Sequence, residues 1–457
     1  MYIDKSNDIV KSVSFGDPAM LGVGVQRTMS LLESSTPEHR NTVRLLYYGQ
    51  SGMESGWCEM LTELLRERFP YANLIIENRA LGGFSSQRLV RTSETDLYTF
   101  YPDLMILNVL GADGDYEDII RRTRERTTAE ILILTDHVRK LDEIEEETNP
   151  DNIVRGVSDW NLYFDCKFLP AVAKKYGCGF GNIRDMWKTY LRDTGINPDI
   201  LLGSDKSHLG PKGCRVMAEM VNAYLTYRPE LPYDDTSVQT SVVGKDIQWV
   251  DDKLMLDFTG NRVDVVMKEG TSTTTSVTID VTPPSKNPEL YRLTRALATP
   301  GAKWPVILKI TSQAPLLVEE WTMQVAVNKN NPLNYTFTVQ GSLTGVDGAG
   351  SSDQLFVSNS GRIVIDPADW DVEYALTGLP RIPIPDNFVV NWRVEPYFID
   401  SIISPKVKND GTETIVTLAQ GLVNGQHTLG ISGCQQTPIG AVRIYRPMPP
   451  VMGRVVE

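Results

Sequence analysis

Four continuous apolar runs, separated by amphipathic stretches, mark the first half of the chain. They are "VRLLYYG" (43–49), "ANLIIEN" (72–78), "DLMILNV" (103–109) and "EILILTD" (130–136). Strands of a parallel sheet that is covered on both faces have this composition, because neither alternating set of side chains meets water. The pattern therefore predicts four buried strands of one mostly parallel sheet.

Between and after these runs, apolar residues recur at steps of three and four, which is the spacing of a helix packed by one face. In 54–69 they are Trp57, Leu61, Leu64, Leu65 and Phe69, and in 159–176 they are Phe164, Phe168, Leu169, Val172 and Tyr176. A last helix is predicted to begin near Pro211, because proline suits a first helical turn. Alternating strands and helices predict an α/β domain over residues 43–228.

The segments on either side of this domain have other patterns. Residues 1–42 are interpreted as an N-terminal segment and linker, with one helix predicted over 24–34. After "YRPELPYDDTS" (227–237), short alternating stretches are broken by Gly, Pro, Asn and Asp, which predicts a β-sandwich over 235–457. The alternating stretches are 276–281, 335–341, 361–367 and 388–394. "GSLTGVDGAGSSD" (341–353) is interpreted as a flexible surface loop rather than a metal site, because its aspartates lack the spacing of a metal-binding loop.

Composition narrows the class of protein. The net charge of −13 argues against nucleic acid as a partner, and no apolar run approaches the length of a membrane span. The N-terminus lacks the apolar core of a signal peptide, so we expect a cytoplasmic protein, or a periplasmic or secreted one if a leader was removed. The cysteines form no C-x-x-C pair and are interpreted as buried free thiols. They are Cys58, Cys166, Cys178, Cys214 and Cys434.

Candidate chemistry begins where the first strand ends, in "YYGQSGM", because a strand-to-helix turn exposes Ser51 at a helix N-terminus. A serine nucleophile needs a base, usually histidine. Of the four histidines, His39 lies in the linker and His427 lies on an apparent strand of the β half, which leaves His137 and His208.

His208 follows Asp205 by three residues in "GSDKSHLGPKG" (203–213). At this spacing in a loop, the carboxylate can reach the imidazole Nδ1–H and leave Nε2 free to accept the serine proton. The other interpretation is that Asp205 caps the following helix and His208 is simply exposed.

Three blocks in this order resemble the SGNH (GDSL-type) hydrolase superfamily: "YYGQSGM", with Gln50 in place of the usual Asp, "ENRALGGFSSQ" (77–87), and the final D-x-x-H. The resemblance covers about residues 43–226 and implies a three-layer α/β domain. It also implies that Ser51 is the nucleophile, His208 the base and Asp205 the residue that orients it. The backbone N–H groups of Ser51 and Gly83 would hold the oxyanion, with no metal or organic cofactor.

The third block of the superfamily, Gly-x-Asn-Asp after the third strand, is not matched by "NVLGADGDY" (108–116). Depending on the alignment, Ala112 or Asp113 takes the place of the Asn that donates to the oxyanion, and neither Ala nor an ionised Asp can donate. The third donor is therefore Asn108, a protonated Asp113, or none. We hypothesise that the two backbone N–H groups act alone, and that Asp113 shapes a turn or contacts sugar. His137 is expected to pack or to bind substrate, and its replacement to change KM more than the chemical step.

An SGNH domain beside a β-sandwich resembles the arrangement of bacterial carbohydrate acetylesterases, whose accessory modules are jelly rolls. This resemblance predicts a serine esterase that removes O-acetyl groups from a plant polysaccharide of the xylan or xyloglucan type through an acyl-enzyme. The alternatives are a general short-chain esterase and a catalytically impaired carbohydrate-binding protein. The oligomeric state is left open.

Tryptophans of the β half would either stack on sugar or fill the core. They are Trp249, Trp304, Trp321, Trp370 and Trp392. If the β half helps to hold the polymer, deletion of residues 240–457 should reduce acetyl release from polysaccharide more than from 4-nitrophenyl acetate.

Overall fold

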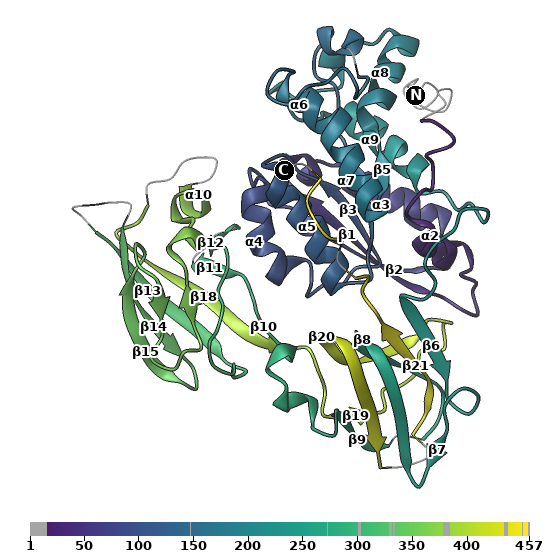
Figure 1. The fold of residues 1–457 in the computed structure, drawn as a ribbon, viewed down its shortest axis with the longest axis vertical. Coiled ribbons are helices and arrows are strands. Elements are labelled where there is room, and N and C mark those ends of the chain that lie inside the picture. The colour runs from purple at the N-terminus through teal and green to yellow at the C-terminus, as the bar shows by residue number, and fades with distance from the viewer. Residues whose placement is uncertain are drawn as a thin grey trace, which may run out of the picture.

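The structure, a computed structural model, consists of three lobes (Figure 1). It describes residues 16–146, 148–271, 273–299, 303–328, 331, 334–377, 384–433, 437–449 and 451–455. Cys434 lies outside these ranges. Of the other cysteines, Cys58, Cys178 and Cys214 are buried free thiols and Cys166 is partly buried, so the expectation of burial holds fully for three of these four.

The first lobe contains a five-stranded sheet in the order β2-β1-β3-β4-β5, and all of its pairs are parallel. The strands are β1 (Thr42–Gly49), β2 (Asn73–Asn78), β3 (Leu104–Asn108), β4 (Glu130–Leu134) and β5 (Gly179–Gly181). Every residue of β3 and β4 is buried, as continuous apolar runs require. The four predicted strands are confirmed, and the short β5 is an addition.

Helices cover both faces of this sheet, which makes the predicted three-layer α/β domain. One apolar cluster joins the sheet to α2 (Gln26–Glu33), α3 (Trp57–Arg68), α8 (Ile183–Thr194) and α9 (Pro211–Tyr224). The other joins it to α4 (Ser86–Asp96), α5 (Asp113–Arg126) and α7 (Leu169–Tyr176). The predicted helices over 54–69 and from Pro211 are confirmed.

The helix predicted over 159–176 is present, but its winding changes along its length. It consists of α6 (Trp160–Tyr163), a π-helical turn over Phe164–Phe168, and α7. Pro170 has no N–H to donate, and its ring clashes with the carbonyl four residues earlier, so a regular α-helix cannot continue through this position. The wider π turn lies directly before this proline.

The N-terminal helix α2 is also confirmed, and it packs onto the parallel sheet. Its Arg27 and Thr28 N–H groups donate to the buried carboxylate of Glu130 at 2.9 and 2.7 Å. Glu130 begins β4, so α2 is tied to the sheet directly. The segment that the sequence places ahead of the domain therefore contributes to its core.

The C-terminal half is antiparallel β structure, as predicted, and it forms two lobes (Figure 1). The base lobe has a seven-stranded sheet made of β6 (Val238–Val242), β7 (Trp249–Val250), β8 (Lys253–Met267), β9 (Thr274–Ile279), β19 (Ser401–Ile403), β20 (Thr414–Ser432) and β21 (Ile439–Tyr445). α9 ends at Tyr224 and β6 begins at Val238, so the predicted change of pattern at 227–237 falls between them.

The insert lobe, residues 291–396, lies in the chain between β9 and β19 of the base lobe and has its own apolar cluster. Its main sheet contains β10 (Tyr291–Leu293), β11 (Ala296–Thr299), β12 (Pro305–Ile307), β13 (Glu320–Val327), β14 (Tyr335–Gly341), β15 (Gly345–Ser351) and β18 (Asn387–Pro396). A pair of short strands, β16 (Phe356–Val357) and β17 (Val364–Ile365), and the helix α10 (Val372–Thr377) complete it.

The prediction of a flexible loop at 341–353 is wrong, because most of this segment is β15. Asp347 is buried there and accepts hydrogen bonds from the Ser360 N–H and hydroxyl at 2.8 and 2.7 Å. Gly350 lies against the rings of Phe337 and Phe356, where any side chain would collide. Gly350 provides space for aromatic packing, and Asp347 is satisfied internally.

The base lobe covers the edge of the parallel sheet from which β3 and β4 start. The Asn261 side chain accepts from the Tyr101 hydroxyl at 2.7 Å and donates to the Arg126 carbonyl at 2.9 Å. Gln420 donates to the carbonyls of Tyr98 and Thr99 at 3.1 and 3.0 Å. The opposite edge, where the strands end, is therefore left free for chemistry.

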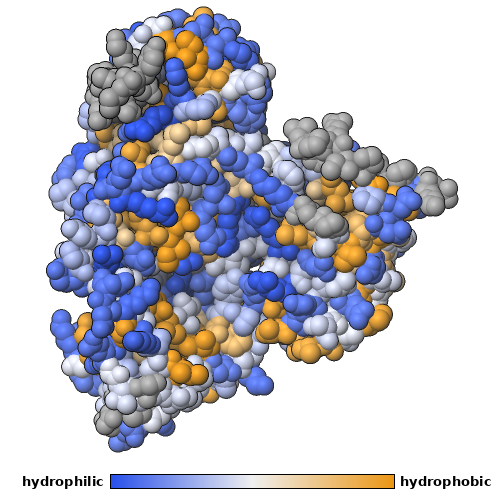
Figure 2. Space-filling view, turned by 180° about the vertical axis from the view of Figure 1, so that it is seen from behind, coloured by the Kyte–Doolittle hydropathy of each residue, from blue (hydrophilic) through white to orange (hydrophobic). Residues whose placement is uncertain are grey.

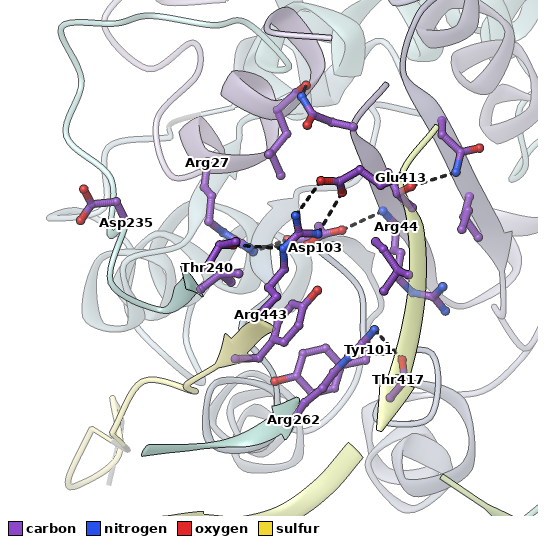
Figure 3. A pocket seen from close by; sticks show the side chains of 18 of the residues that line it. Arg27, Arg44, Tyr101, Asp103, Asp235, Thr240, Arg262, Glu413, Thr417 and Arg443 are labelled. Atoms are coloured by element: carbon purple, nitrogen blue, oxygen red, sulfur yellow. Dashed lines mark hydrogen bonds and ion pairs between the residues drawn. The ribbon is translucent and has the colours of Figure 1, made fainter. Parts of the chain in front are cut away.

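A pocket of about 420 Å³ lies within this junction (Figure 3). Three of the four arginines in its lining are paired with carboxylates: Arg443 contacts Glu413 at 2.9 and 3.1 Å, and Arg27 lies 3.5 Å from Asp103. Arg262, also in its lining, is paired with a buried aspartate at 2.8 Å. These pairs neutralise most of the charge, so the pocket is a polar joint between lobes.

The rear face carries small groups of hydrophobic residues scattered among hydrophilic ones (Figure 2). Among the described residues, no helix combines the length and the apolar character needed to cross a bilayer.

Candidate active site

Ser51 lies two residues after the end of β1, at the edge of the sheet where the parallel strands end. It opens a 3-10 turn, Ser51–Glu54, in which the Met53 N–H donates to the Gln50 carbonyl at 2.9 Å. The Asn78 side chain donates to the Met53 carbonyl at 2.7 Å and ties the turn to the end of β2. As the first residue of the turn, Ser51 has an N–H without an intrahelical acceptor.

The loop before α9 brings a carboxylate and an imidazole together. Asp205 Oδ1 accepts from the N–H groups of Ser207 and His208, both at 3.0 Å, which closes a tight turn. Lys206, in the middle, has a left-handed φ of 56°. The Gly203 N–H donates to the His208 carbonyl at 2.7 Å and closes the base of the loop.

Ser51, His208 and Asp205 form one hydrogen-bonded chain. His208 Nδ1 lies 2.6 Å from Asp205 Oδ2, and His208 Nε2 lies 2.8 Å from Ser51 Oγ. The His208 hydrogen bond and the N–H groups of Ser207 and His208 hold the pKa of Asp205 well below its ordinary value. The ionised carboxylate therefore favours a proton on Nδ1 and leaves Nε2 as the acceptor that faces the serine.

The alternative role for Asp205, as the cap of α9, is wrong. The N-cap position of α9 is Gly210, and no side chain caps that end. The side chains of His208 and Asp205 are 45% and 52% exposed, so the site is open to solvent. Exposure at a surface leaves room for an acyl group attached to a large molecule.

Gly82 and Gly83 form the loop after β2, next to the serine turn. A methyl group on Gly82 would lie 3.6 Å from Ser51 Cβ and would collide with the Glu54 carboxylate. Gly83 has a φ of 75°, and a side chain there would strike the Tyr374 hydroxyl. In the part of the chain that the structure describes, the Gly83 N–H has no hydrogen-bond acceptor.

Neither side-chain candidate for a third oxyanion donor is available. Asn108 ends β3, and its side-chain NH₂ group donates hydrogen bonds to the carbonyls of Leu134 and Thr135 at 3.2 and 3.5 Å. The Asp113 carboxylate lies 2.8 Å from Arg155 and accepts from a tyrosine hydroxyl. An ion-paired carboxylate accepts hydrogen bonds rather than donating them.

The sequence suggested that Asp113 shapes a turn, and this prediction is wrong. It is the first residue of α5, where a negative charge is favoured by the helix dipole. Its partners Arg155 and Tyr163 come from later in the chain, so no local pattern indicated them.

His137 lies beneath the loop of residues 203–208, which carries Asp205 and His208, rather than in an open pocket. It is 7% exposed and packs on Trp187, with ring centroids 5.5 Å apart. Its Nε2 lies 3.1 Å from the Ser207 carbonyl, and its Nδ1 lies 3.1 Å from Asp136. The arrangement fits the expected packing role and makes His137 a support for the loop that carries His208.

The remaining candidates from the sequence lie away from the serine. His427 is part of β20 and lies 2.8 Å from Asp280, while His39 is exposed. Trp321 and Trp392 are buried and stacked at 6.3 Å, so the suggestion that they offer faces to sugar is wrong. Trp304 donates a hydrogen bond to Gly82 in the loop after β2, which we call the glycine loop. No group of three or more potential metal ligands occurs in the described residues.

No protein-family model matches this chain, and no curated protein matches it. The solved structures that are similar to this chain include the following three. LAE5, an α/β hydrolase from the metagenome of Lake Arreo in Spain, is 18% identical with a TM-score of 0.33, over 42% of this chain and 98% of its own. Axe2, an acetylxylan esterase from Geobacillus stearothermophilus, is 14% identical with a TM-score of 0.33, over 42% and 98%. CEX, a two-domain esterase active on acetylated mannans, is 11% identical with a TM-score of 0.35, over 94% and 97%. Likenesses at this level do not determine a function.

Proposed function

We propose that this chain is a serine esterase in which Ser51 is the nucleophile. The observation that supports this most directly is the unbroken hydrogen-bonded chain from Asp205 through His208 to Ser51, with contacts of 2.6 and 2.8 Å. Ser51 lies 157 positions before His208 in the sequence, and the two side chains meet with Nε2 facing Oγ. This arrangement can remove a proton from the hydroxyl as it attacks.

The reaction follows from this geometry. Nε2 of His208 takes the Ser51 proton while Oγ bonds to the ester carbonyl carbon, and the carbonyl oxygen becomes an oxyanion. The imidazolium then returns the proton to the alkoxide oxygen, the ester bond breaks, and an alcohol leaves an acyl-serine. Water, deprotonated by His208, attacks the acyl-serine, and the carboxylic acid and free Ser51 are regenerated.

Asp205 supports these steps without exchanging a proton. Its low pKa keeps it ionised, so it stabilises the imidazolium and fixes the proton on Nδ1. The N–H groups of Ser51 and Gly83 would receive the oxyanion, and the loss of one such donor typically costs about 10²–10³ in kcat.

For the substrate, we propose O-acetyl groups on a carbohydrate, of the plant xylan or xyloglucan type. The exposed triad supports an ester carried by a bulky, hydrophilic alcohol. The pairing of the α/β domain with two β lobes, one of which reaches the glycine loop, supports a polymer rather than a small ester. A general short-chain esterase is the alternative.

Turnover of 4-nitrophenyl acetate by the wild type, Ser51→Ala and His208→Ala tests the nucleophile and base. Each variant should lose at least about a thousandfold in kcat, and the double variant should be little worse, because the residues act as a unit. Ser204→Ala is the matched control, since Ser204 is exposed near the triad and makes no hydrogen bond in the described residues. Near-normal turnover by Ser51→Ala would refute the assignment.

Acetate release from acetylated xylan, xyloglucan and mannan, compared with 4-nitrophenyl acetate, tests the substrate. A polysaccharide specificity predicts a higher kcat/KM on one polymer than on the small ester. Equal or lower values on every polymer would favour the general esterase.

A further inference from the structure

Two side chains of the insert lobe hold a single carbonyl group next to the catalytic serine. The indole Nε1–H of Trp304 donates to the Gly82 carbonyl at 3.0 Å, and the Tyr374 hydroxyl donates to the same oxygen at 2.7 Å. Trp304 lies just before β12, and Tyr374 lies in α10. We call Trp304 and Tyr374 the Gly82 clamp.

The clamp is braced from several sides. Its two rings meet edge to face with centroids 5.8 Å apart, and the Tyr374 ring packs on Phe84 at 5.7 Å. Arg88 of α4 lies over the Tyr374 ring at 4.9 Å and pairs with Asp371 at 2.8 Å. Burial raises the pKa of Tyr374, so its hydroxyl keeps the proton that it donates. The insert lobe is thus fixed at the loop between β2 and α4.

A second contact joins the insert lobe to the serine turn itself. Lys303, the neighbour of Trp304, forms an ion pair with Glu54, the last residue of the 3-10 turn that Ser51 opens. The lobe therefore contacts both segments that would carry oxyanion donors.

Peptide geometry connects the clamp to the candidate oxyanion donor. In a planar trans peptide, the carbonyl of one residue and the N–H of the next point in opposite directions. When the clamp fixes the Gly82 carbonyl, it also fixes the direction of the Gly83 N–H, which points away from Trp304 and Tyr374. That N–H has no acceptor among the described residues, and Gly82 lies beside Ser51.

We propose that Trp304 and Tyr374 are positioning residues that aim the Gly83 N–H at the oxyanion. This inference rests on the proposed function of Ser51. It assigns the insert lobe a role in the chemical step, besides any contact with the polymer. The side chains of Asn108 and Asp113 are already bonded to other groups, so the oxyanion hole depends on backbone N–H groups. Such a hole needs the peptide that carries the donor to be held rigidly.

Trp304→Phe and Tyr374→Phe remove one donor each and keep the aromatic packing. Because the other donor remains, each single variant should lose about three- to tenfold in kcat, the size of one hydrogen bond. The double variant should lose about a hundredfold, as when an oxyanion donor is removed, with KM for 4-nitrophenyl acetate within about twofold of wild type. Inhibition by methylboronic acid, whose tetrahedral adduct on Ser51 places an oxygen at this position, should weaken by a similar factor.

Trp370→Phe and Tyr335→Phe are the matched controls, since they remove the same groups in the same lobe without contacting Gly82. Trp370 Nε1 has no hydrogen-bond partner in the described residues, and the two rings pack at 6.1 Å. The controls should keep kcat, and thermal melting should show each variant folded. If the double variant does not fold, the two single variants carry the test.

Two outcomes separate this inference from the proposed function. If Ser51→Ala keeps wild-type turnover, the proposed function is wrong and the clamp has no such role. If turnover depends on Ser51 but the clamp variants match their controls in kcat and boronate inhibition, only the clamp is refuted. A rise in KM with unchanged kcat would also refute it, because that result means substrate contact.

Discussion

Replacement of Asp205 by Asn separates the orientation of His208 from the shape of its loop. Asp205 uses Oδ1 for the N–H groups of Ser207 and His208 and Oδ2 for His208 Nδ1. An asparagine can keep its oxygen on the two backbone N–H groups, but then its NH₂ faces Nδ1. Nδ1 must become the acceptor, the ring proton moves to Nε2, and Nε2 can no longer take the serine proton.

The opposite orientation of the asparagine side chain also disturbs the site. If the asparagine oxygen faces Nδ1–H, its NH₂ group faces two backbone N–H donors, and the turn around Lys206 loses its closing bonds. In a buried triad, the wrong tautomer costs about 10⁴ in kcat. Here both side chains are about half exposed, so water can satisfy part of the flipped arrangement, and we expect a loss of about 10³.

The assay is kcat for 4-nitrophenyl acetate, with Asp199→Asn as control. Asp199 is an exposed carboxylate near the loop, and among the described residues its side chain pairs only with Lys206. KM should be unchanged. A lowered pKa means that the Asp205 charge is lost only as the pH falls far below neutral, so this residue adds no inflection between pH 5 and 9. A loss in Asp205→Asn of less than tenfold would show that the carboxylate does not orient the base.

Three further changes test the surroundings of the triad. His137→Gln should lower kcat about tenfold with little change in KM, because His137 supports the Ser207 carbonyl through one hydrogen bond. A rise in KM alone would instead indicate the substrate-binding role that the sequence suggested. Asp113→Asn should leave kcat within a few-fold, since Arg155 and Tyr163 occupy the carboxylate, and a gain in kcat would place this residue at the oxyanion. Burial, with Asp136 nearby, raises the pKa of Asp165 to about 8, so the folded state holds a proton that the unfolded chain has lost above about pH 4. The melting temperature should therefore fall from pH 5 to pH 8, and Asp165→Asn should flatten that slope; an unchanged slope would contradict the raised pKa.

The catalytic candidates were predictable because each depends on a local signal. Ser51 follows a strand whose apolar run is unmistakable, and Asp205 and His208 are three residues apart ahead of a helix that begins at a proline. The parallel order of the strands then brings these segments to one edge of the sheet. Short-range spacing and the topology of an α/β domain were enough to connect them.

The features that the sequence did not reveal depend on contacts between distant residues. Tyr374 and Gly82 lie 292 positions apart in the chain and are joined by one hydrogen bond, and neither belongs to a periodic pattern. The glycine-rich segment 341–353 resembles a loop because small residues are typical of loops, whereas here most of it is β15 and Gly350 makes room for Phe337 and Phe356. Local composition cannot distinguish a glycine that bends freely from one that fits under a ring.

The insertion of one β lobe within the other changes the meaning of a deletion experiment. Loss of residues 240–457 would remove Tyr374 and Trp304 from Gly82, and it would also uncover the sheet edge that Asn261 covers through Tyr101. Turnover of 4-nitrophenyl acetate should then fall along with acetyl release from polymer, contrary to the expectation that the polymer reaction suffers more. Equal loss on both substrates would not show that the β half only stabilises the fold. Under the clamp proposal, the insert lobe also fixes the direction of the Gly83 N–H, which acts in the chemical step. The clamp variants keep both lobes in place, so they can distinguish a role in catalysis from a role in folding, which the deletion cannot.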